Sequence, residues 1–236
     1  MVDVLNRAAV AQMIEATKLG PGVKADDVRG LVDDAVALGV GGICVPPGYV
    51  GLARRLLDEK NASLDLVTVA NFPFGDSSVE AVEAEVRTAV TMGADHVDVV
   101  APIGMILSEN WGGVDAFFIR IVQAVRDVED KRRKVQIKII LETATLGSEA
   151  IWMASGLAVH SGVDWLKTST GFHPAGGATE HAVHTLRRSA PPFVRIKASG
   201  GIRTWRDVER MVSAGADRVG TSAYRDILDA FEARTR

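Results

Sequence analysis

The chain has 236 residues, of which 47% are hydrophobic and 24% are charged, the composition of an ordinary soluble globular protein. Its 27 basic and 30 acidic residues give a formal charge of -3 and are interspersed, so no basic stripe suggests nucleic acid as a partner. No segment approaches the roughly 18 consecutive apolar residues of a membrane span. The one basic cluster, residues 131–134, lies between a helical pattern and a strand and is interpreted as a solvated loop.

The single cysteine and the N-terminal residues bear on the cellular compartment. One cysteine excludes an internal disulfide framework and fits a reducing environment. The N-terminal segment carries Asp3, Arg7 and Glu15 and has no apolar core of signal-peptide length. We therefore expect a cytoplasmic enzyme or binding domain, with no membrane as its partner.

One pattern recurs along the chain: a helical stretch, a glycine-containing junction and a short β-branched run. It occurs at residues 37–44, 92–99, 161–167 and 214–220. A glycine after the last helical residue adopts the left-handed conformation that ends a helix, and the next strand begins at once. This repetition indicates stacked βα units around a parallel sheet.

The segments between these junctions complete a set of eight candidate strands with amphipathic helical patterns between them. Eight βα units in a chain of this size predict a single-domain (β/α)8 TIM barrel that takes up residues 1–236. An open doubly wound sheet is the rival fold, but no G-x-G-x-x-G motif follows the first strand. One helix is expected over residues 77–92, with Ser77 or Ser78 as its N-cap. The expected strands lie near Gln12–Thr17, Gly41–Val45, Asp65–Asn71, His96–Ala101, Val135–Glu142, Trp165–Ser169, Phe193–Ala198 and Arg218–Thr221.

Two lysines lie in neighbouring predicted strands. Lys167 stands within the apolar segment 163–171, and Lys197 stands at the same height in the next strand. A buried ammonium is unfavourable unless it is paired or loses its proton. Because like charges repel, two inward lysines lower the pKa of one of them, and a neutral lysine amine forms Schiff bases with carbonyl compounds. The alternative is that the lysines point outward between helices; the matched pair favours a functional role.

Acidic residues in the fourth and fifth strands add to this predicted interior. Asp98 stands among β-branched residues and, if it faces inward, can pair with a lysine and move protons at a reacting carbon. A structural ion pair with Lys197 is the alternative, and the two roles are compatible. Period-two alternation puts Lys138 and Glu142 on one face, where they can neutralise each other. Glu142 is therefore expected to support the site.

Glycine-rich loops follow the seventh and eighth strands. Glycines let backbone N–H groups approach a phosphate dianion, and a helix that begins near Thr204 or Ser222 directs its positive end there. Barrel enzymes often place a phosphate site in the loops after these two strands. The predicted phosphate-binding residues are Gly200, Gly201, Gly220, Thr221 and Ser222.

The single cysteine and the histidines give weaker signals. Cys44 ends the second predicted strand and either lines the mouth of the barrel or is buried as a small hydrophobic residue. The five histidines show no metal-ligand spacing: His181 and His184 are expected on a solvated helix face, and His173 in a loop. We therefore expect no metal site and no cofactor.

Two stretches are highly specific: Trp165–Phe172, which reads WLKTSTGF, and Ile196–Arg203, which reads IKASGGIR. Residues 93–100, 71–75 and 43–45 add supporting motifs. On these residues the chain resembles the class I deoxyribose-phosphate aldolases from about Gly39 to Ser222. The resemblance implies an aldehyde-lyase that reversibly cleaves 2-deoxy-D-ribose 5-phosphate to D-glyceraldehyde 3-phosphate and acetaldehyde.

The resemblance also implies roles for individual residues. Lys167 corresponds to the Schiff-base nucleophile, Lys197 to the neighbour that lowers its pKa, and Asp98 to the proton-relay acid. The iminium at Lys167 withdraws electrons as the C–C bond breaks, and the glycine loops hold the phosphate away from that bond. A homodimer is a family expectation. The substrate-binding positions expected from the alignment of motifs are Glu15, Thr17, Cys44, Thr168, Ser169 and Gly171.

The first strand departs from the family's usual Ile-Asp-His-Thr-Leu-Leu-Lys-Pro. Glu15 replaces the aspartate, Ala16 the histidine and Lys18 a leucine. In the family that aspartate helps to hold a substrate hydroxyl, and Glu15 reaches one methylene further. Three alternatives therefore stay open: a related Schiff-base aldolase with a different aldehyde acceptor, a non-covalent sugar-phosphate isomerase that uses Asp98 and Glu142, and a sugar-phosphate sensor.

Overall fold

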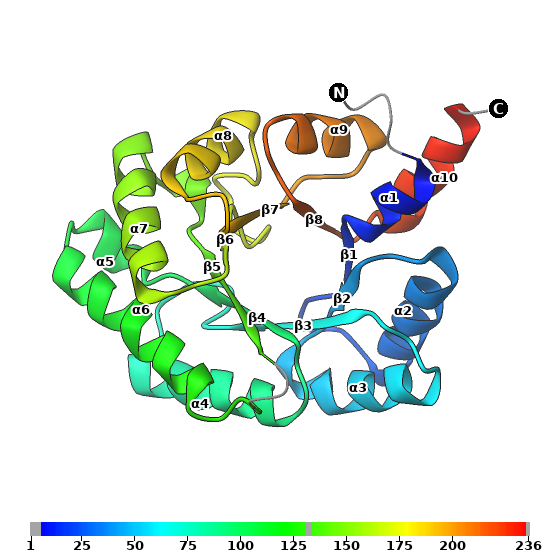
Figure 1. Ribbon diagram of the computed structural model, residues 1–236, viewed down its shortest axis with the longest axis horizontal. Coiled ribbons are helices and arrows are strands. Elements are labelled where there is room, and N and C mark those ends of the chain that lie inside the picture. The colour runs from blue at the N-terminus through cyan, green and yellow to red at the C-terminus, as the bar shows by residue number, and fades with distance from the viewer. Residues whose placement is uncertain (1–5, 131–133, 235–236) are drawn as a thin grey trace.

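The computed structural model describes residues 6–130 and 134–234, without the side chains of residues 232–234. Asp3 and most of the basic cluster at residues 131–134 therefore lie outside the described residues. Eight parallel strands form a closed barrel in chain order, each paired with the next and β8 with β1 (Figure 1). The predicted TIM barrel is confirmed. The strands are β1 (Ile14–Thr17), β2 (Gly42–Cys44), β3 (Asp65–Ala70), β4 (His96–Val100), β5 (Gln136–Ile140), β6 (Trp165–Lys167), β7 (Arg195–Ser199) and β8 (Arg218–Thr221).

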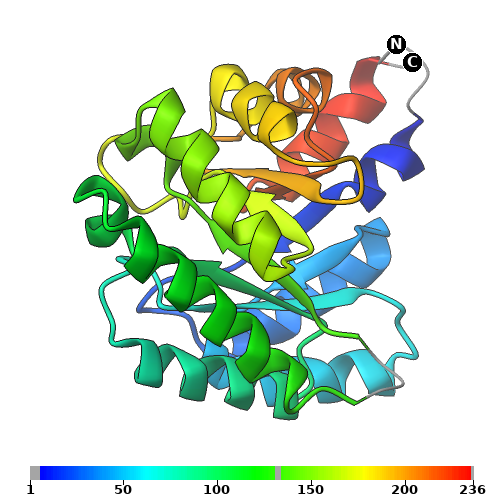
Figure 2. The same cartoon turned by 60° about the vertical axis from the view of Figure 1, so that its left-hand side comes forward.

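Helices surround this barrel on all sides in both views (Figures 1 and 2). None of the helices in the described ranges is long and apolar enough to cross a bilayer. The helices that follow β1 to β4 are α2 (Ala25–Leu38), η1 (Pro47–Tyr49), α3 (Val50–Glu59), α4 (Val79–Thr91), α5 (Ile103–Leu107) and α6 (Trp111–Arg126). After β5 come η2 (Thr143–Thr145), α7 (Ser148–Ser161), α8 (Glu180–Ser189), α9 (Trp205–Ser213) and α10 (Tyr224–Arg234), and α1 (Arg7–Gln12) precedes β1.

Helix α4 shows how the sequence pattern produces these elements. Its N-cap is Ser78, whose hydroxyl accepts a hydrogen bond from the Ala81 N–H at 3.4 Å, as one of the two predicted caps requires. Val82, Val86 and Val90 recur at helical spacing and are all buried against the barrel. Burial of this apolar stripe supplies most of the energy that holds the helix on the sheet.

Alternation along the strands decides which side chains enter the barrel. In β4 and β5, Val97, Val99, Ile137 and Ile139 belong to the hydrophobic core that packs against the helices. The intervening positions point into the barrel, and there Asp98 lies directly opposite Lys138 in the strand register. Lys167 pairs in the same way with Lys197. Parallel pairing at equal height therefore collects charged side chains inside the barrel.

Strands β5 and β6 each end two residues earlier than predicted. Strand β5 ends at Ile140, and Glu142 has a φ of 50°, a left-handed conformation that turns the chain out of the sheet. Strand β6 ends at Lys167, two residues before the predicted end at Ser169. The residues after these ends leave the strand alternation, so their side chains do not continue the inward face.

Candidate active site

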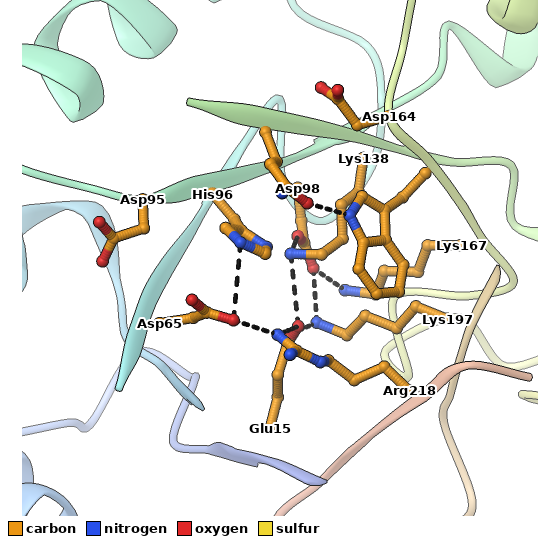
Figure 3. A network of polar contacts seen from close by, with 12 residues as sticks. Glu15, Asp65, Asp95, His96, Asp98, Lys138, Asp164, Lys167, Lys197 and Arg218 are labelled. Carbon is orange, nitrogen blue, oxygen red and sulfur yellow. Dashed lines mark hydrogen bonds and ion pairs between the residues drawn. The ribbon is translucent and has the colours of Figure 1, made fainter. Parts of the chain in front are cut away.

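Asp98 on β4 lies at the centre of a buried cluster of three lysines (Figure 3). Its Oδ1 accepts a hydrogen bond from the Lys138 Nζ at 2.9 Å. Its Oδ2 accepts bonds from the Nζ atoms of Lys167 and Lys197, each at 2.8 Å. These side chains come from four consecutive strands, β4 to β7. The two lysines predicted at equal height therefore share one carboxylate oxygen.

Glu15 on β1 closes this cluster from the opposite side of the barrel. It is fully buried and forms ion pairs with Lys197, with Lys138 at 3.3 Å and with Arg218 at 3.4 Å. Arg218 on β8 also pairs with Asp65 at 2.6 Å. Glu15 is thus bound to three cations within the buried cluster.

The indole of Trp165 lies beside these cations on the floor of the cluster. The Nζ of Lys138 lies 5.7 Å from the ring centroid, and the guanidinium carbons of Arg195 and Arg218 lie 5.3 and 5.4 Å away. The face of an indole carries partial negative charge and attracts cations at such distances. Its N–H donates to the side-chain oxygen of Gln136, which fixes the orientation of the ring.

A cavity of about 410 Å³ opens above the lysines at the carboxyl ends of the strands. Lys167 and Lys197 form part of its wall, and the ends of β1, β7 and β8 with the loops after β1, β6, β7 and β8 form the rest. It is the end of the barrel where TIM-barrel enzymes carry out their chemistry. The predicted residues that line it are Thr17, Lys167, Gly171, Lys197, Gly200, Gly201, Gly220, Thr221 and Ser222.

The glycines of these loops are required by backbone geometry. Gly200 and Gly201 have φ values of 90° and 77°, which side chains rarely allow. A Cβ on Gly200 would lie 2.9 Å from the Gly177 Cα and 3.2 Å from the Gly171 Cα, so the loops after β6 and β7 meet there backbone to backbone. Because these glycines have no side chains, this wall presents main-chain N–H groups, which can bind an anion.

The start of α9 differs from the prediction. The Asp207 carboxylate accepts hydrogen bonds from the backbone N–H groups of Arg203 and Thr204, at 3.1 and 2.9 Å. The predicted positive end at Thr204 is therefore already engaged by an acidic side chain of the same helix. Ser222, which precedes α10, does line the cavity.

A comparison with models of known families matches residues 7–230 to the DeoC/LacD family aldolases. That range contains all eight strands and every cavity residue named above. The chain belongs to this family. The resemblance seen in the lysine and glycine motifs is thereby confirmed, and the protein is an aldolase.

Named relatives match this aldolase over nearly their whole length. The deoxyribose-phosphate aldolase of Corynebacterium glutamicum is 40% identical, with 95% of this chain and 97% of that protein covered. That of Thermococcus kodakarensis is 36% identical, with 95% and 98% covered. Among solved structures, a putative deoxyribose-phosphate aldolase from Coccidioides immitis superposes with a TM-score of 0.88 at 30% identity, covering 98% of this chain and 87% of that one. A tetrameric deoxyribose phosphate aldolase from Aeropyrum pernix also gives 0.88, at 29% identity, covering 99% and 95%.

The two lysines of the aldolase that share Asp98 have opposite pKa shifts. Burial lowers the pKa of Lys167, Asp98 partly offsets this, and the positive charge of Lys197 lowers it further. Burial also disfavours the charged form of Lys197, but Asp98 and Glu15 together raise its pKa above the usual value. Lys167 is therefore the amine that loses its proton more readily.

Charge balance in the cluster agrees with that assignment. Three cations, Lys138, Lys197 and Arg218, face three carboxylates, Asp98, Glu15 and Asp65. Burial alone would raise the carboxyl pKa of Asp98 and Glu15, but the surrounding lysines lower both. A charged Lys167 would add a fourth cation, so the neutral amine leaves the buried cluster balanced.

His96 lies beside Asp65 on the floor of the barrel, with its Nε2 3.6 Å from the carboxylate. Burial and the charge of Lys138 lower the pKa of His96 to about 2. The imidazole is therefore neutral and adds no charge to the cluster.

Two acidic residues occupy different places from those predicted. Glu15 does not line the cavity, and its carboxylate forms ion pairs with Lys138, Lys197 and Arg218 instead. Glu142 does not neutralise Lys138. Its carboxylate instead accepts bonds from the N–H of Thr170, at 3.2 Å, and from the Thr170 hydroxyl. The early end of β5 turns Glu142 toward the loop after β6.

Three predicted substrate-binding side chains are buried away from the cavity. The Thr168 hydroxyl accepts a hydrogen bond from the Ser199 N–H at 3.1 Å, and the Ser169 carbonyl oxygen accepts one from the Ser199 hydroxyl. Both residues therefore join the ends of β6 and β7. Cys44 lies in a small apolar cluster with Val67 and Val69, and burial raises the pKa of its thiol to about 11. That thiol is protonated at neutral pH and does not act as a nucleophile.

Other lining residues escaped the sequence reasoning. Thr170, Phe172, Ser199 and Arg203 lie on the cavity wall. Arg203 belongs to the IKASGGIR motif, so the motif itself was the available signal. Thr170 and Phe172 belong in the same way to the WLKTSTGF motif, but strand alternation does not extend beyond Lys167 and so does not tell which of these residues line the cavity.

Proposed function

We propose that the protein is a deoxyribose-phosphate aldolase that forms a Schiff base at Lys167. Its reaction is the reversible cleavage of 2-deoxy-D-ribose 5-phosphate to D-glyceraldehyde 3-phosphate and acetaldehyde. The observation that carries the proposal is one cavity with a lysine of lowered pKa on one wall and glycine loops on another. The names of the relatives and the solved structures support the same substrate.

Cleavage begins at the amine of Lys167. The neutral Nζ attacks the aldehyde carbon of the open-chain sugar, and loss of water gives an iminium. Removal of the proton from the hydroxyl at C3 lets the C2–C3 electron pair flow toward the iminium nitrogen. The C3 fragment leaves as glyceraldehyde 3-phosphate, and an enamine of acetaldehyde remains on Lys167. Protonation of the enamine carbon and addition of water release acetaldehyde and restore the amine.

Asp98 is placed to manage protons at Lys167. Its Oδ2 lies 2.8 Å from the Lys167 Nζ and 2.8 Å from the Lys197 Nζ. Asp98 does not line the cavity, so it exchanges protons with the substrate through these amines and through water. Lys197 reaches the cavity as a permanent cation and stabilises negative charge that develops on substrate oxygens.

The phosphate group orients the sugar for this reaction. We place it against Gly200, Gly201 and Ser222, on the wall built by the loops after β7 and β8. Binding energy from this remote group holds the aldehyde carbon against Lys167 and so lowers the entropic cost of bringing the two together. The isomerase alternative loses its support, because the Glu142 carboxylate is engaged by Thr170 rather than placed beside Asp98.

The test is cleavage of 2-deoxy-D-ribose 5-phosphate, with both products measured. We expect equimolar glyceraldehyde 3-phosphate and acetaldehyde, and a kcat/KM at least tenfold lower for unphosphorylated 2-deoxyribose. Binding of the sugar phosphate without any cleavage would contradict the proposal and leave the sensor alternative.

Compartment and assembly belong to the same proposal. We propose a cytoplasmic location, which the single free and buried cysteine supports. We further propose that the chain forms a homodimer, although the relative from Aeropyrum pernix is described as a tetramer. Sedimentation velocity distinguishes these states, and a monomeric mass at micromolar concentration would contradict self-association.

A further inference from the structure

Three neighbouring strands of the barrel, β7, β8 and β1, are each followed by a polar residue that lines the cavity above the lysines (Figure 1). Arg203 follows β7, Ser222 follows β8 and Lys18 follows β1. Lys18 lies two residues beyond the register pair of Ala16 and Thr221, next to the start of α10. A cationic residue therefore follows the strand on either side of β8.

Lys18 is held in this structure by a partner outside the cavity. Its Nζ lies 3.4 Å from the Oδ1 of Asp27, and the two side chains are 47% and 35% exposed. An exposed ion pair of this kind is weak, because water and salt screen the charges. The Oδ2 of Asp27 accepts a hydrogen bond from the Lys24 N–H at 2.9 Å and so caps α2. Lys18 can therefore leave Asp27 without disturbing the start of that helix.

A phosphate group is a stronger acceptor for this lysine than Asp27 is. A phosphate monoester carries about two negative charges near neutral pH and has three strong acceptor oxygens. The glycines and Ser222 on the wall beside it supply uncharged donors, so two cations at the rim, Arg203 and Lys18, would balance the dianion. Lysine is a compact charge on a flexible stem, so it can turn from one acceptor to another by rotation about its side-chain bonds.

We propose that Lys18 is a specificity residue that leaves Asp27 and binds the phosphate group of the substrate. The inference rests on the proposed function, because it takes the phosphate of 2-deoxy-D-ribose 5-phosphate to lie against the glycine wall. Asp27 competes with the phosphate for the same ammonium, so the two residues have opposite effects on affinity. Leucine is the usual residue of the family at position 18, so this contact is a feature of this chain.

Substitution of Lys18 should change substrate binding and not the chemical step, because the phosphate lies away from the bond that breaks. We expect Lys18→Leu to raise the KM for the phosphorylated sugar about fivefold, with kcat within about twofold of wild type. The kcat/KM for unphosphorylated 2-deoxyribose should stay the same, since that sugar offers Lys18 no anion. Lys18→Arg retains the charge and should restore most of the affinity. The difference should shrink in concentrated salt, which screens exposed charges.

Asp27→Asn tests the competition itself. The amide oxygen can still accept the Lys24 N–H, but the charge that holds Lys18 is removed, so the KM for the phosphorylated sugar should fall by about twofold. In the Lys18→Leu background the same substitution should have no effect, because no ammonium remains to be released. A purely structural role of Lys18 and Asp27 would not give opposite changes in KM.

A second lysine paired with the same helix gives matched control variants. Lys60 pairs with Asp33 of α2 at 2.7 Å, its side chain is 39% exposed, and neither residue lines the cavity. Lys60→Leu and Asp33→Asn therefore remove the same charges as the two test variants at a place that the substrate does not reach. Neither should change the KM for the phosphorylated sugar.

Calorimetric titration with inorganic phosphate makes the test independent of turnover, and we expect Lys18→Leu to bind it about fivefold more weakly than wild type. If wild type cleaves the phosphorylated sugar and Lys18→Leu has the same KM, the inference is overturned and the proposed function stands. An equal loss of kcat/KM with both sugars has the same meaning. If wild type cleaves neither sugar, the proposed function fails; equal phosphate affinities of the two proteins, or no binding by either, then overturn the role of Lys18 as well.

Discussion

Strands β6 and β7 place two lysines side by side, yet the surroundings of the two strands give those lysines opposite properties. Lys167 on β6 bonds Asp98 and faces the cavity, and its pKa is lowered. Lys197 on β7 bonds the same oxygen of Asp98, but Glu15 from β1 pairs with it as well, and its pKa is raised. In the proposed mechanism, this second carboxylate keeps Lys197 charged and leaves Lys167 as the nucleophile.

The same contrast explains how Glu15, on the first strand, can affect the reaction. Glu15 does not touch the cavity, so its effect on the chemistry passes through Lys197, Lys138 and Arg218. Because Lys197 stays positive, it disfavours a second charge on Lys167. We therefore propose that Glu15 acts on Lys167 only through these cations, and variants of the cluster test the difference between the two lysines.

The largest effect is expected from Lys167→Arg. Arginine keeps a cation in the pocket but cannot form an iminium, so kcat/KM for cleavage should fall on the order of 10⁴-fold or more. Lys167→Met serves as the partner variant without charge and should be equally inactive. Cleavage rates and circular dichroism check both; a variant that retains a tenth of the activity would show that Lys167 is not the nucleophile.

Glu15→Gln removes the carboxylate that pairs with Lys197 but not with Lys167. It leaves Lys138, Lys197 and Arg218 with one carboxylate fewer in a buried site, so the free energy of unfolding should fall by about 3–5 kcal/mol. The pKa of Lys197 should fall as well, and Lys197 should then react with aldehydes alongside Lys167. Urea denaturation and mapping of trapped adducts test these two effects. Glu15→Asp is the control that retains the charge; equal stability of Glu15→Gln and wild type would contradict the account.

Lys197→Leu should change the pH dependence of the reaction. Loss of the neighbouring cation raises the pKa of Lys167, and only the neutral amine attacks the substrate, so the rising limb of the kcat/KM profile moves to higher pH. Activity at neutral pH should therefore fall by about tenfold or more and recover partly under alkaline conditions. A profile of reduced height but unchanged midpoint would show that Lys197 does not tune Lys167.

Gly220→Ala is expected to have the smallest effect. A Cβ at this position on β8 would lie 2.9 Å from the Lys197 Cε and 3.3 Å from the Ser199 Cβ. The ion pairs of Lys197 prevent it from moving away freely, so stability should fall by about 1–3 kcal/mol, as overpacking typically costs. Gly30→Ala in α2 is the control, since nothing lies within 4 Å of its added Cβ. Thermal unfolding distinguishes them; an equally stable Gly220→Ala would mean that Lys197 is not held firmly.

The fold and the lysine pair could be predicted because their causes are local. Glycine junctions mark each helix end, and strand alternation fixes which side of β6 and β7 faces inward. Parallel strands of similar length then bring Lys167 and Lys197 to equal height. The glycine loops could be predicted for the same reason, because the left-handed φ values at these positions require glycine, and Gly200 and Gly201 are visible in the sequence.

The remaining parts of the site depend on where each strand ends and on how the barrel closes. The left-handed backbone at Glu142 cannot be inferred from its neighbours. It turns the Glu142 side chain away from Lys138, which pairs with Asp98 instead. The burial of Glu15 follows from the pairing of β1 with β8, which brings Arg218 beneath it. These are contacts between residues far apart in the chain, and no periodicity along it encodes them.

The most direct test is reduction with borohydride in the presence of acetaldehyde, followed by peptide mass mapping. The reagent converts the iminium into a stable secondary amine, so the modified residue identifies the nucleophile. The account predicts an added ethyl group on Lys167 alone, with Lys197 unmodified at neutral pH. Modification of Lys197 in the wild-type protein, or of neither lysine, would contradict it.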